Sequence, residues 1–348
     1  MEERKLPESA QQEAGTAPEA GAAPEAHDAS EGGKSSVIAA IAGNVGVAVV
    51  KFIASFLSGS SALFSEAIHS LVDCGNGLLL LVGMRKSRRK PDFYHPFGSG
   101  KELYFYTLIV ALAIFLLGGG VALKEGIEAV QAALAGTAQI GDPLVGYVVL
   151  ICAAIIEGLS LRVALKNFNA ARGNLGPIAF IKQAKDPSLY TVVMEDSAAE
   201  VGLLFALVGT VLTQATRNAV FDGAASIAIG LLLCAVAVVL LRATKGLLVG
   251  VGVNPEEVEQ MRALVEQDPM VVECGRILTN YMGPANLLVA MDVTFQPSLR
   301  ADDADGVTDR IEAAIRQQWP ETSEVFIEVE CLGECLRQQQ VEDTWDVR

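Results

Sequence analysis

Long apolar segments alternate with short polar ones over the first two thirds of the chain. A helix that crosses a bilayer needs about 20 mostly apolar residues. Six segments approach this length: 36–57, 60–84, 103–123, 143–164, 187–213 and 223–241. The third and the sixth contain no Asp, Glu, Lys or Arg. The pattern therefore predicts an α-helical membrane domain with six transmembrane helices, which we place at 36–248.

The charges of the loops predict how this domain is oriented. The loops 85–101 and 162–186 are rich in Lys and Arg, whereas the loops on the other side carry only Lys124 and Arg217. Basic loops stay on the cytoplasmic side of a membrane. With six spans, the N- and C-termini are then both expected in the cytoplasm.

After residue 250 the pattern becomes that of a soluble α+β domain. Asn254 and Pro255, with two glutamates behind them, make a good helix start, because Asn caps a helix and Pro suits its first position. Further along, apolar and polar residues alternate as they do in half-buried strands. We expect the order helix, strand, strand, helix, strand within 254–331, forming a small open sheet with its helices on one face. The ranges after the first helix are 271–280, 287–295, 307–315 and 324–330.

Polar tails flank the two domains. Residues 1–35 are rich in Ala, Glu, Pro and Gly, which predicts a disordered acidic tail. This tail lacks the apolar core of a signal peptide and is too acidic for an organelle transit peptide. Residues 332–348 are expected to form a second, shorter polar tail.

Composition narrows the class of protein further. Hydrophobic residues make up 51% of the chain, and the formal net charge is −15. Nucleic acid is not an expected partner, because phosphate binding needs a basic surface. No nucleophile–base arrangement or phosphate-binding glycine loop points to an enzyme. The bias toward Ala, Gly and Val fits a bacterial inner membrane.

Polar side chains interrupt the second apolar segment along one helical face. Glu66, His69, Asp73 and Asn76 are three or four residues apart, so a helix places them on one stripe. Ionisable groups in a membrane are costly to bury and mark ion pathways. A His and an Asp one turn apart can bind the same divalent ion. We therefore predict a membrane transporter for a divalent metal, with His69 and Asp73 as ligands.

The fifth apolar segment carries a second acidic cluster. Asp196 and Glu200 are four residues apart and share a helix face, while Glu195 lies about 100° away. Like charges in a membrane interior repel each other unless a cation or a proton lies between them. Packing this helix against the second would bring Asp196, and either Glu200 or a water, to His69 and Asp73. Such ligands suit zinc, manganese, ferrous iron or cobalt, and their protonation would couple metal export to proton entry.

The remaining polar residues of the spans are expected to line the pathway or to hold helices together. Glu66 either accepts a hydrogen bond from the imidazole of the stripe or extends toward the outer interface. Asn44 and Glu157 lie within their spans, and hydrogen bonding between helices is the better explanation for Asn44. Glu195 is expected to bond to a neighbouring helix, and Lys51 to pair with a carboxylate or reach the interface.

These residues resemble the motifs of the cation diffusion facilitator family. The matching sequences are His69-Ser-Leu-Val-Asp73 in the second span and His95-Pro-Phe-Gly-Ser-Gly100 in the following loop. The resemblance covers about 35–331. It implies efflux of a divalent metal, zinc first among them, through six spans with a cytoplasmic ferredoxin-like domain. It also implies assembly as a homodimer and no cofactor beyond the transported ion.

Two positions depart from the usual pattern of that family. Val192 stands where a ligand is common in the fifth span, while the Glu195-Asp196 pair resembles the branch that includes the animal mitochondrial zinc transporter. The resemblance also assigns Asp92 and His95 to a second metal site in the loop. A further His is common there, and Ser99 replaces it, which leaves this second site incomplete.

Alternatives to zinc export stay open on the sequence alone. The same ligands would serve efflux of manganese, iron or cobalt by the same mechanism. A chain with Val192 in place of a ligand could instead be a non-transporting, membrane-anchored metal-binding or scaffold protein. The buried carboxylates argue against the scaffold, because nothing would then offset the cost of burying them.

Overall fold

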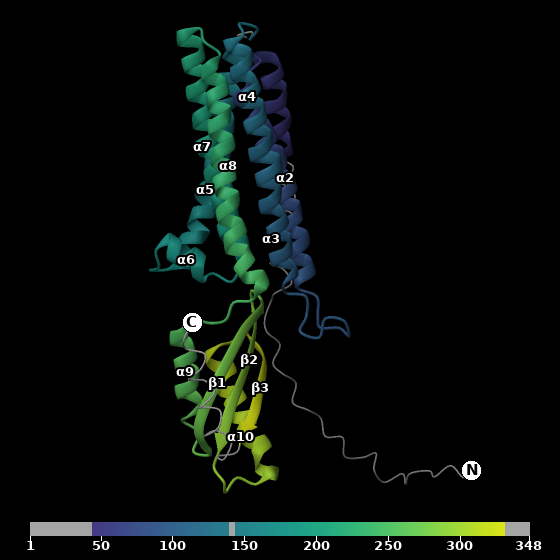
Figure 1. Cartoon of the computed structure of the whole chain (residues 1–348), viewed down its shortest axis with the longest axis vertical. Helices are drawn as coiled ribbons and strands as arrows, with labels where there is room; N and C mark the ends of the chain where they lie inside the picture. The colour runs from purple at the N-terminus through teal and green to yellow at the C-terminus, as the bar shows by residue number, and fades with distance from the viewer. Residues whose placement is uncertain (1–43, 139–142, 331–348) are drawn as a thin grey trace, which may run out of the picture. The chain divides into compact units, whose positions relative to one another are not determined.

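The computed structural model describes residues 44–138 and 143–330 (Figure 1). The predicted tails at 1–35 and 332–348 lie outside the described residues, as does the start of the first predicted span.

Five helical stretches of the described chain are long and apolar enough to cross a bilayer. They are α2 (Ser61–Ser87), the continuous stretch Glu102–Leu134, α5 (Pro143–Arg172), α7 (Pro187–Thr216) and α8 (Val220–Val249). A shorter apolar helix, Asn44–Ser58, precedes them. The second to sixth predicted segments are thus confirmed as helices.

The third predicted segment is longer and less regular than its sequence suggests. It consists of α3 (Glu102–Ala113), the π-helical turn η2 (Ile114–Gly120) and α4 (Val121–Leu134). The predicted segment ends at residue 123 because charged residues begin there. The structure continues the helix through these charged residues, and Lys124 forms ion pairs with Glu125 and Glu128 there.

The start of α2 is held by a residue of another helix. Ser60 caps α2 by accepting the backbone N–H of Leu63. Asp222, in the first turn of α8, also accepts the backbone N–H groups of Ser61 and Ala62, at 2.6 and 3.3 Å. The first backbone N–H groups of a helix have no partner within it, so Asp222 satisfies two of them and ties α2 to α8.

Glycines allow α4 and η2 to approach α8 closely. A Cβ added to Gly126 would lie 2.9 Å from the carbonyl oxygen of Gly223, and one added to Gly230 would lie 3.0 Å from that of Gly119. Both distances are shorter than ordinary van der Waals contact. Small residues permit such backbone contact between membrane helices, and Figure 1 shows these helices running side by side.

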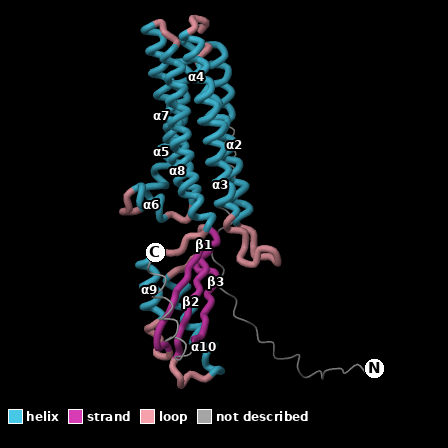
Figure 2. Tube along the Cα trace, in the orientation of Figure 1, coloured by secondary structure: helices cyan, strands magenta, loops and turns pink. Residues whose placement is uncertain are grey.

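Between residues 250 and 330 the chain forms a three-stranded sheet with two helices (Figure 2). Its elements follow the predicted order, which is confirmed: α9 (Pro255–Val265), β1 (Val271–Gly283), β2 (Asn286–Phe295), α10 (Ala301–Gln318) and β3 (Thr322–Glu330). β1 pairs with β2 in antiparallel fashion across a tight turn. β2 and β3 are parallel, which requires the crossover that α10 provides.

Apolar residues from both helices and all three strands build the core of this domain. Met261 of α9, Leu287 and Val289 of β2, and Ile315 of α10 are fully buried. The buried residues of β2 are two apart and those of the helices four apart, as the sequence pattern predicted, whereas irregularities in the pairing of β1 with β2 give β1 a spacing of three to four. The short helix α6 (Pro177–Gln183) was not predicted, because it has a single turn of apolar residues and contributes no buried side chain.

Candidate metal centre

The stripe of α2 lies inside the membrane domain. Glu66, His69 and Asn76 are each no more than 1% exposed, and Asp73 is half-buried. His69 Nδ1 is 3.5 Å from Asp73 Oδ1. Within the described residues neither ring nitrogen of His69 has a hydrogen-bond partner. A buried imidazole without partners is costly, and a bound cation would relieve that cost.

Glu195 and Asp196, the acidic pair of α7, accept hydrogen bonds from two different neighbouring helices. Asn76 of α2 donates a hydrogen bond from Nδ2 to Glu195 Oε1 at 2.8 Å. Ser160 of α5 donates from Oγ to Asp196 Oδ2 at 2.9 Å. Asp73 is close enough to Glu195 and Asp196 for their charges to interact. The structure therefore brings the acidic groups of α2 and α7 into one polar region.

Glu200 lies one turn further along α7 in the same polar region. Its Oε1 is buried and has no hydrogen-bond partner among the described residues. That atom lies 3.0 Å from the position that a Cβ would take at Gly158 of α5. Glu200 thus fits against α5 because residue 158 is a glycine, and it interacts with the charges of Glu157 and Asp196.

Glu66 differs from its predicted role beside His69. Its Oε2 lies 3.3 Å from the Nζ atom of Lys51, and no hydrogen bond joins it to His69 within the described chain. Lys51 also donates to Glu157 Oε1 at 2.7 Å and to Ser70 Oγ at 2.8 Å. Glu66 does not extend to an interface: it is fully buried, and its carboxylate pairs with the ammonium group of Lys51 in the protein interior.

Two further residues considered in the sequence analysis, Asn44 and Val192, are exposed. Asn44 is exposed at the start of the described part of its helix, so its predicted bond to another helix is not seen there. Val192 is 37% exposed. Sequence reasoning missed the hydrogen bond of Ser160 and the double pairing of Lys51, because both depend on which helices are neighbours.

The ligands are not gathered around a single point in this conformation. Among residues 44–138 and 143–330, no three His, Cys, Asp or Glu side chains are close enough to hold one metal ion. His69 and Asp73 lie next to each other on α2, whereas Asp196 and Glu200 lie on α7, where Ser160 holds Asp196 in a hydrogen bond.

The loop between α2 and α3 places Asp92 and His95 together on its surface. Asp92 Oδ1 accepts the backbone N–H groups of Tyr94 and His95 and lies 3.1 Å from His95 Nδ1. The backbone N–H of His95 stabilises the ionised carboxylate, which lowers the pKa of Asp92 below its usual value. Both side chains are more than half exposed, so this pair can hold its geometry without a metal.

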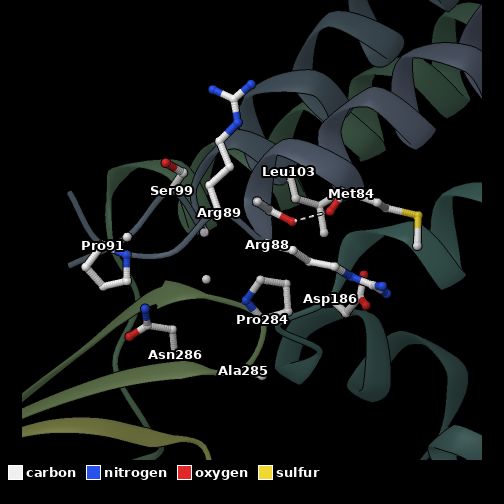
Figure 3. A pocket seen from close by; sticks show the side chains of 14 residues that line it. Met84, Arg88, Arg89, Pro91, Ser99, Leu103, Asp186, Pro284, Ala285 and Asn286 are labelled. Carbon is white, nitrogen blue, oxygen red and sulfur yellow. Dashed lines mark hydrogen bonds between the residues drawn. The ribbon is translucent and has the colours of Figure 1, made fainter. Parts of the chain in front are cut away.

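A pocket of about 370 Å³ borders the same loop (Figure 3). Its lining includes Arg88 and Arg89 after α2, Ser99 of the loop, Asp186 before α7 and Asn286 of β2. Asp92, His95 and the ligands predicted in α2 and α7 do not line it. The pocket is therefore separate from the candidate metal centre.

Comparison with protein families assigns both halves of the chain. Residues 37–249 match the model for the cation efflux transmembrane domain. The chain belongs to the cation efflux family. Residues 253–331 match the model for the cytoplasmic domain of cation efflux proteins. The family resemblance stated from the motifs of α2 and its following loop is thereby confirmed.

Individual relatives point to the branch that the Glu195-Asp196 pair suggested. The frog Xenopus laevis protein "Proton-coupled zinc antiporter SLC30A9, mitochondrial" is 34% identical over 70% of this chain. The human protein of the same name is 32% identical over the same share. The matches span 44% and 43% of those relatives, so this chain aligns with less than half of their length. The "Manganese efflux system protein MneP" of Bacillus subtilis is 25% identical over 85% of this chain and 95% of its own length.

Proposed function

We propose that this chain exports a divalent metal ion, with zinc as its substrate, in exchange for protons. His69, Asp73 and Asp196 bind the ion, and Glu200 supports them. The observation that carries the proposal is the buried His69, whose ring nitrogens lack hydrogen-bond partners among the described residues beside the carboxylates of α2 and α7. Imidazole nitrogen and carboxylate oxygen are ordinary zinc ligands.

Binding of the ion requires the polar region to close. A small shift of α7 toward α2 would release Asp196 from Ser160 and bring it to the ion held by His69 and Asp73. Carboxylate and imidazole must be deprotonated to bind metal. Protons that arrive from the opposite side would therefore compete with the ion and drive its release, which couples the two fluxes.

The remaining features of the molecule follow from this role. We propose six spans, with the helix Asn44–Ser58 in the first, and both termini on the cytoplasmic side as the basic loops indicate. The domain after residue 250 is then a cytoplasmic ferredoxin-like domain that joins two copies of the chain. The protein works as a transporter, not as an enzyme. We propose a bacterial inner membrane as its location, which fractionation in the source cell tests against a mitochondrial one.

The decisive experiment measures metal flux in proteoliposomes under an imposed pH gradient. Zinc uptake by the wild type should depend on the gradient. Asp73→Ala and Asp196→Ala should each reduce it by more than about tenfold, since even groups behind the ligands change metal affinity by 10–100-fold. Glu128→Ala is the matched control, because this exposed carboxylate pairs with Lys124 outside the polar region.

Two results would contradict the proposal. Well-folded wild type that moves no divalent metal would exclude transport and favour the scaffold alternative. Flux that survives in both Asp variants would exclude the assigned ligands. The same assay with manganese tests a second substrate. The likeness to the manganese efflux protein of Bacillus subtilis favours this ion, because this chain is similar to it over 95% of that protein's length.

A further inference from the structure

The side chain of Lys51, including its ammonium group, is buried within the membrane domain. It lies on the helix Asn44–Ser58 and is 0% exposed. Three oxygen atoms from two other helices surround its ammonium group: Glu66 Oε2 at 3.3 Å, Ser70 Oγ at 2.8 Å and Glu157 Oε1 at 2.7 Å. A buried charge is tolerated where it is paired and hydrogen-bonded, and Lys51 meets both conditions.

The two glutamates around Lys51 have more carboxylate oxygens than its ammonium group bonds to. Glu66 Oε1 and Glu157 Oε2 are both buried and lack hydrogen-bond partners among the described residues. Glu66 itself is completely buried, and it fits there because a Cβ at Gly202 of α7 would collide with its Oε1. Two carboxylates thus face one fixed positive charge, and carboxylate oxygens are also ligands that divalent cations take from proteins.

This group adjoins the ligands of the proposed function. Glu66 and Ser70 flank His69 on α2, and the charges of Glu200 and Asp196 interact with those of Glu66 and Glu157. A divalent ion that reaches the centre would therefore meet two sets of carboxylates, unless something fills one of them. The ammonium of Lys51 occupies the second set.

We propose that Lys51 is a tethered counter-cation: its ammonium fills the position between Glu66, Ser70 and Glu157 and so keeps a second metal ion out of the transport centre. This role rests on the proposed function, because the excluded ion is the transported one. Lys51 is a positioning residue. It does not bind the metal, but it restricts the metal to His69, Asp73 and Asp196.

The test counts metal ions bound to the purified full-length protein by elemental mass spectrometry after equilibration with zinc. Lys51→Gln should bind about one more ion per protomer than the wild type, because three oxygens lose their resident cation. Adding Glu157→Gln to this variant should return the count to the wild-type value. Lys51→Arg, which keeps the charge, should also keep the wild-type count.

Lys124→Gln is the matched control, because this exposed lysine pairs with Glu125 and Glu128 on α4. It should not change the count. Folded Lys51→Gln protein with the wild-type count would overturn the proposal. A Lys51→Gln variant that unfolds with and without zinc would also overturn it, since the lysine would then be structural only. Zinc that raises the melting temperature of Lys51→Gln more than those of the wild type and the double variant would support it.

The proposed function is tested separately within the same series. Asp73→Ala should lower the wild-type count, whereas Asp73→Ala combined with Lys51→Gln should bind one ion more than Asp73→Ala alone. An unchanged metal count in Asp73→Ala would contradict the ligand assignment. The role of Lys51 would still be tested by the difference in metal count between Lys51→Gln and the wild type.

Discussion

A single polar residue of another helix holds the start of α2, the helix that carries two of the proposed metal ligands. Asp222 of α8 accepts hydrogen bonds from Ser61 N and Oγ and from Ala62 N at the start of α2. This helix carries His69 and Asp73 further along. The position of these two proposed ligands therefore depends on the carboxylate of Asp222, which belongs to another helix and is distant from them in the sequence.

Replacing Asp222 should weaken both stability and transport. Asp222→Ala leaves backbone N–H groups of α2 without partners and should cost about 1–2 kcal/mol, the usual value of a helix cap. Asp222→Asn keeps one acceptor oxygen and should cost less. Thermal unfolding in detergent measures the difference, with the exposed Glu128→Ala as the control. An unchanged melting temperature for Asp222→Ala would contradict the capping role.

The sequence predicted that the polar residues of α2 share one helix face, but not which residues of other helices they contact. The spacing of Glu66, His69, Asp73 and Asn76 required only that the second apolar segment be helical. The bond from Asn76 to Glu195 and the pairing of Lys51 with two glutamates required three-dimensional neighbours. No periodicity in one chain carries that information, which is why the sequence predicts for Glu66 only a bond to the imidazole or a position at the outer interface.

At the scale of elements, close helix contact explains features that hydrophobicity does not. Gly126 of α4 and Gly223 of α8 face each other, and Gly119 of η2 and Gly230 of α8 do the same one step along. Gly119 and Gly126 are seven residues apart on one helix, and Gly223 and Gly230 are seven apart on the other. This spacing keeps one helix face in contact over two turns. The apolar pattern predicted both helices, but not that glycines bring their backbones together.

Gly126→Ala should destabilise the membrane domain. Its new Cβ would lie 2.7 Å from Ile227 N, so α4 and α8 would have to separate, at a typical cost of about 1–3 kcal/mol for overpacking. Gly120→Ala is the control, because its Cβ would meet only Phe115 O, at 3.7 Å. That change should be neutral or slightly stabilising, since Ala favours helix over Gly by up to about 1 kcal/mol. Equal melting temperatures for the two variants would exclude the tight contact at Gly126.

At the scale of the whole molecule, the described residues form two hydrophobic cores with no residue in common. One lies within the membrane helices, and the other lies between α9, α10 and the sheet. A core that is complete in itself is the mark of a domain that folds on its own. The change in hydrophobic pattern after residue 250 predicted this division, because period-two strands and a bilayer-length helix bury their side chains in different surroundings.

Damage to the second core should therefore leave the first intact. Met291 of β2 is 2% exposed and pairs with Ile277 and Ile327 on either side of it. Met291→Ala should lower the stability of the domain after residue 250 by about 2–5 kcal/mol, the usual cost of removing a buried large side chain. Met270→Ala, at a 37% exposed position before β1, is the matched control and should have little effect.

Two readouts separate the domains in the full-length protein. Calorimetry should show the transition of the domain after residue 250 moving to lower temperature in Met291→Ala, while that of the membrane domain stays in place. Zinc should still stabilise the membrane transition of this variant as it does in the wild type, because ligand binding raises the stability of the unit that binds it. A single transition that shifts as a whole would mean that the two cores unfold together, and the ion in the membrane helices would then also stabilise the sheet.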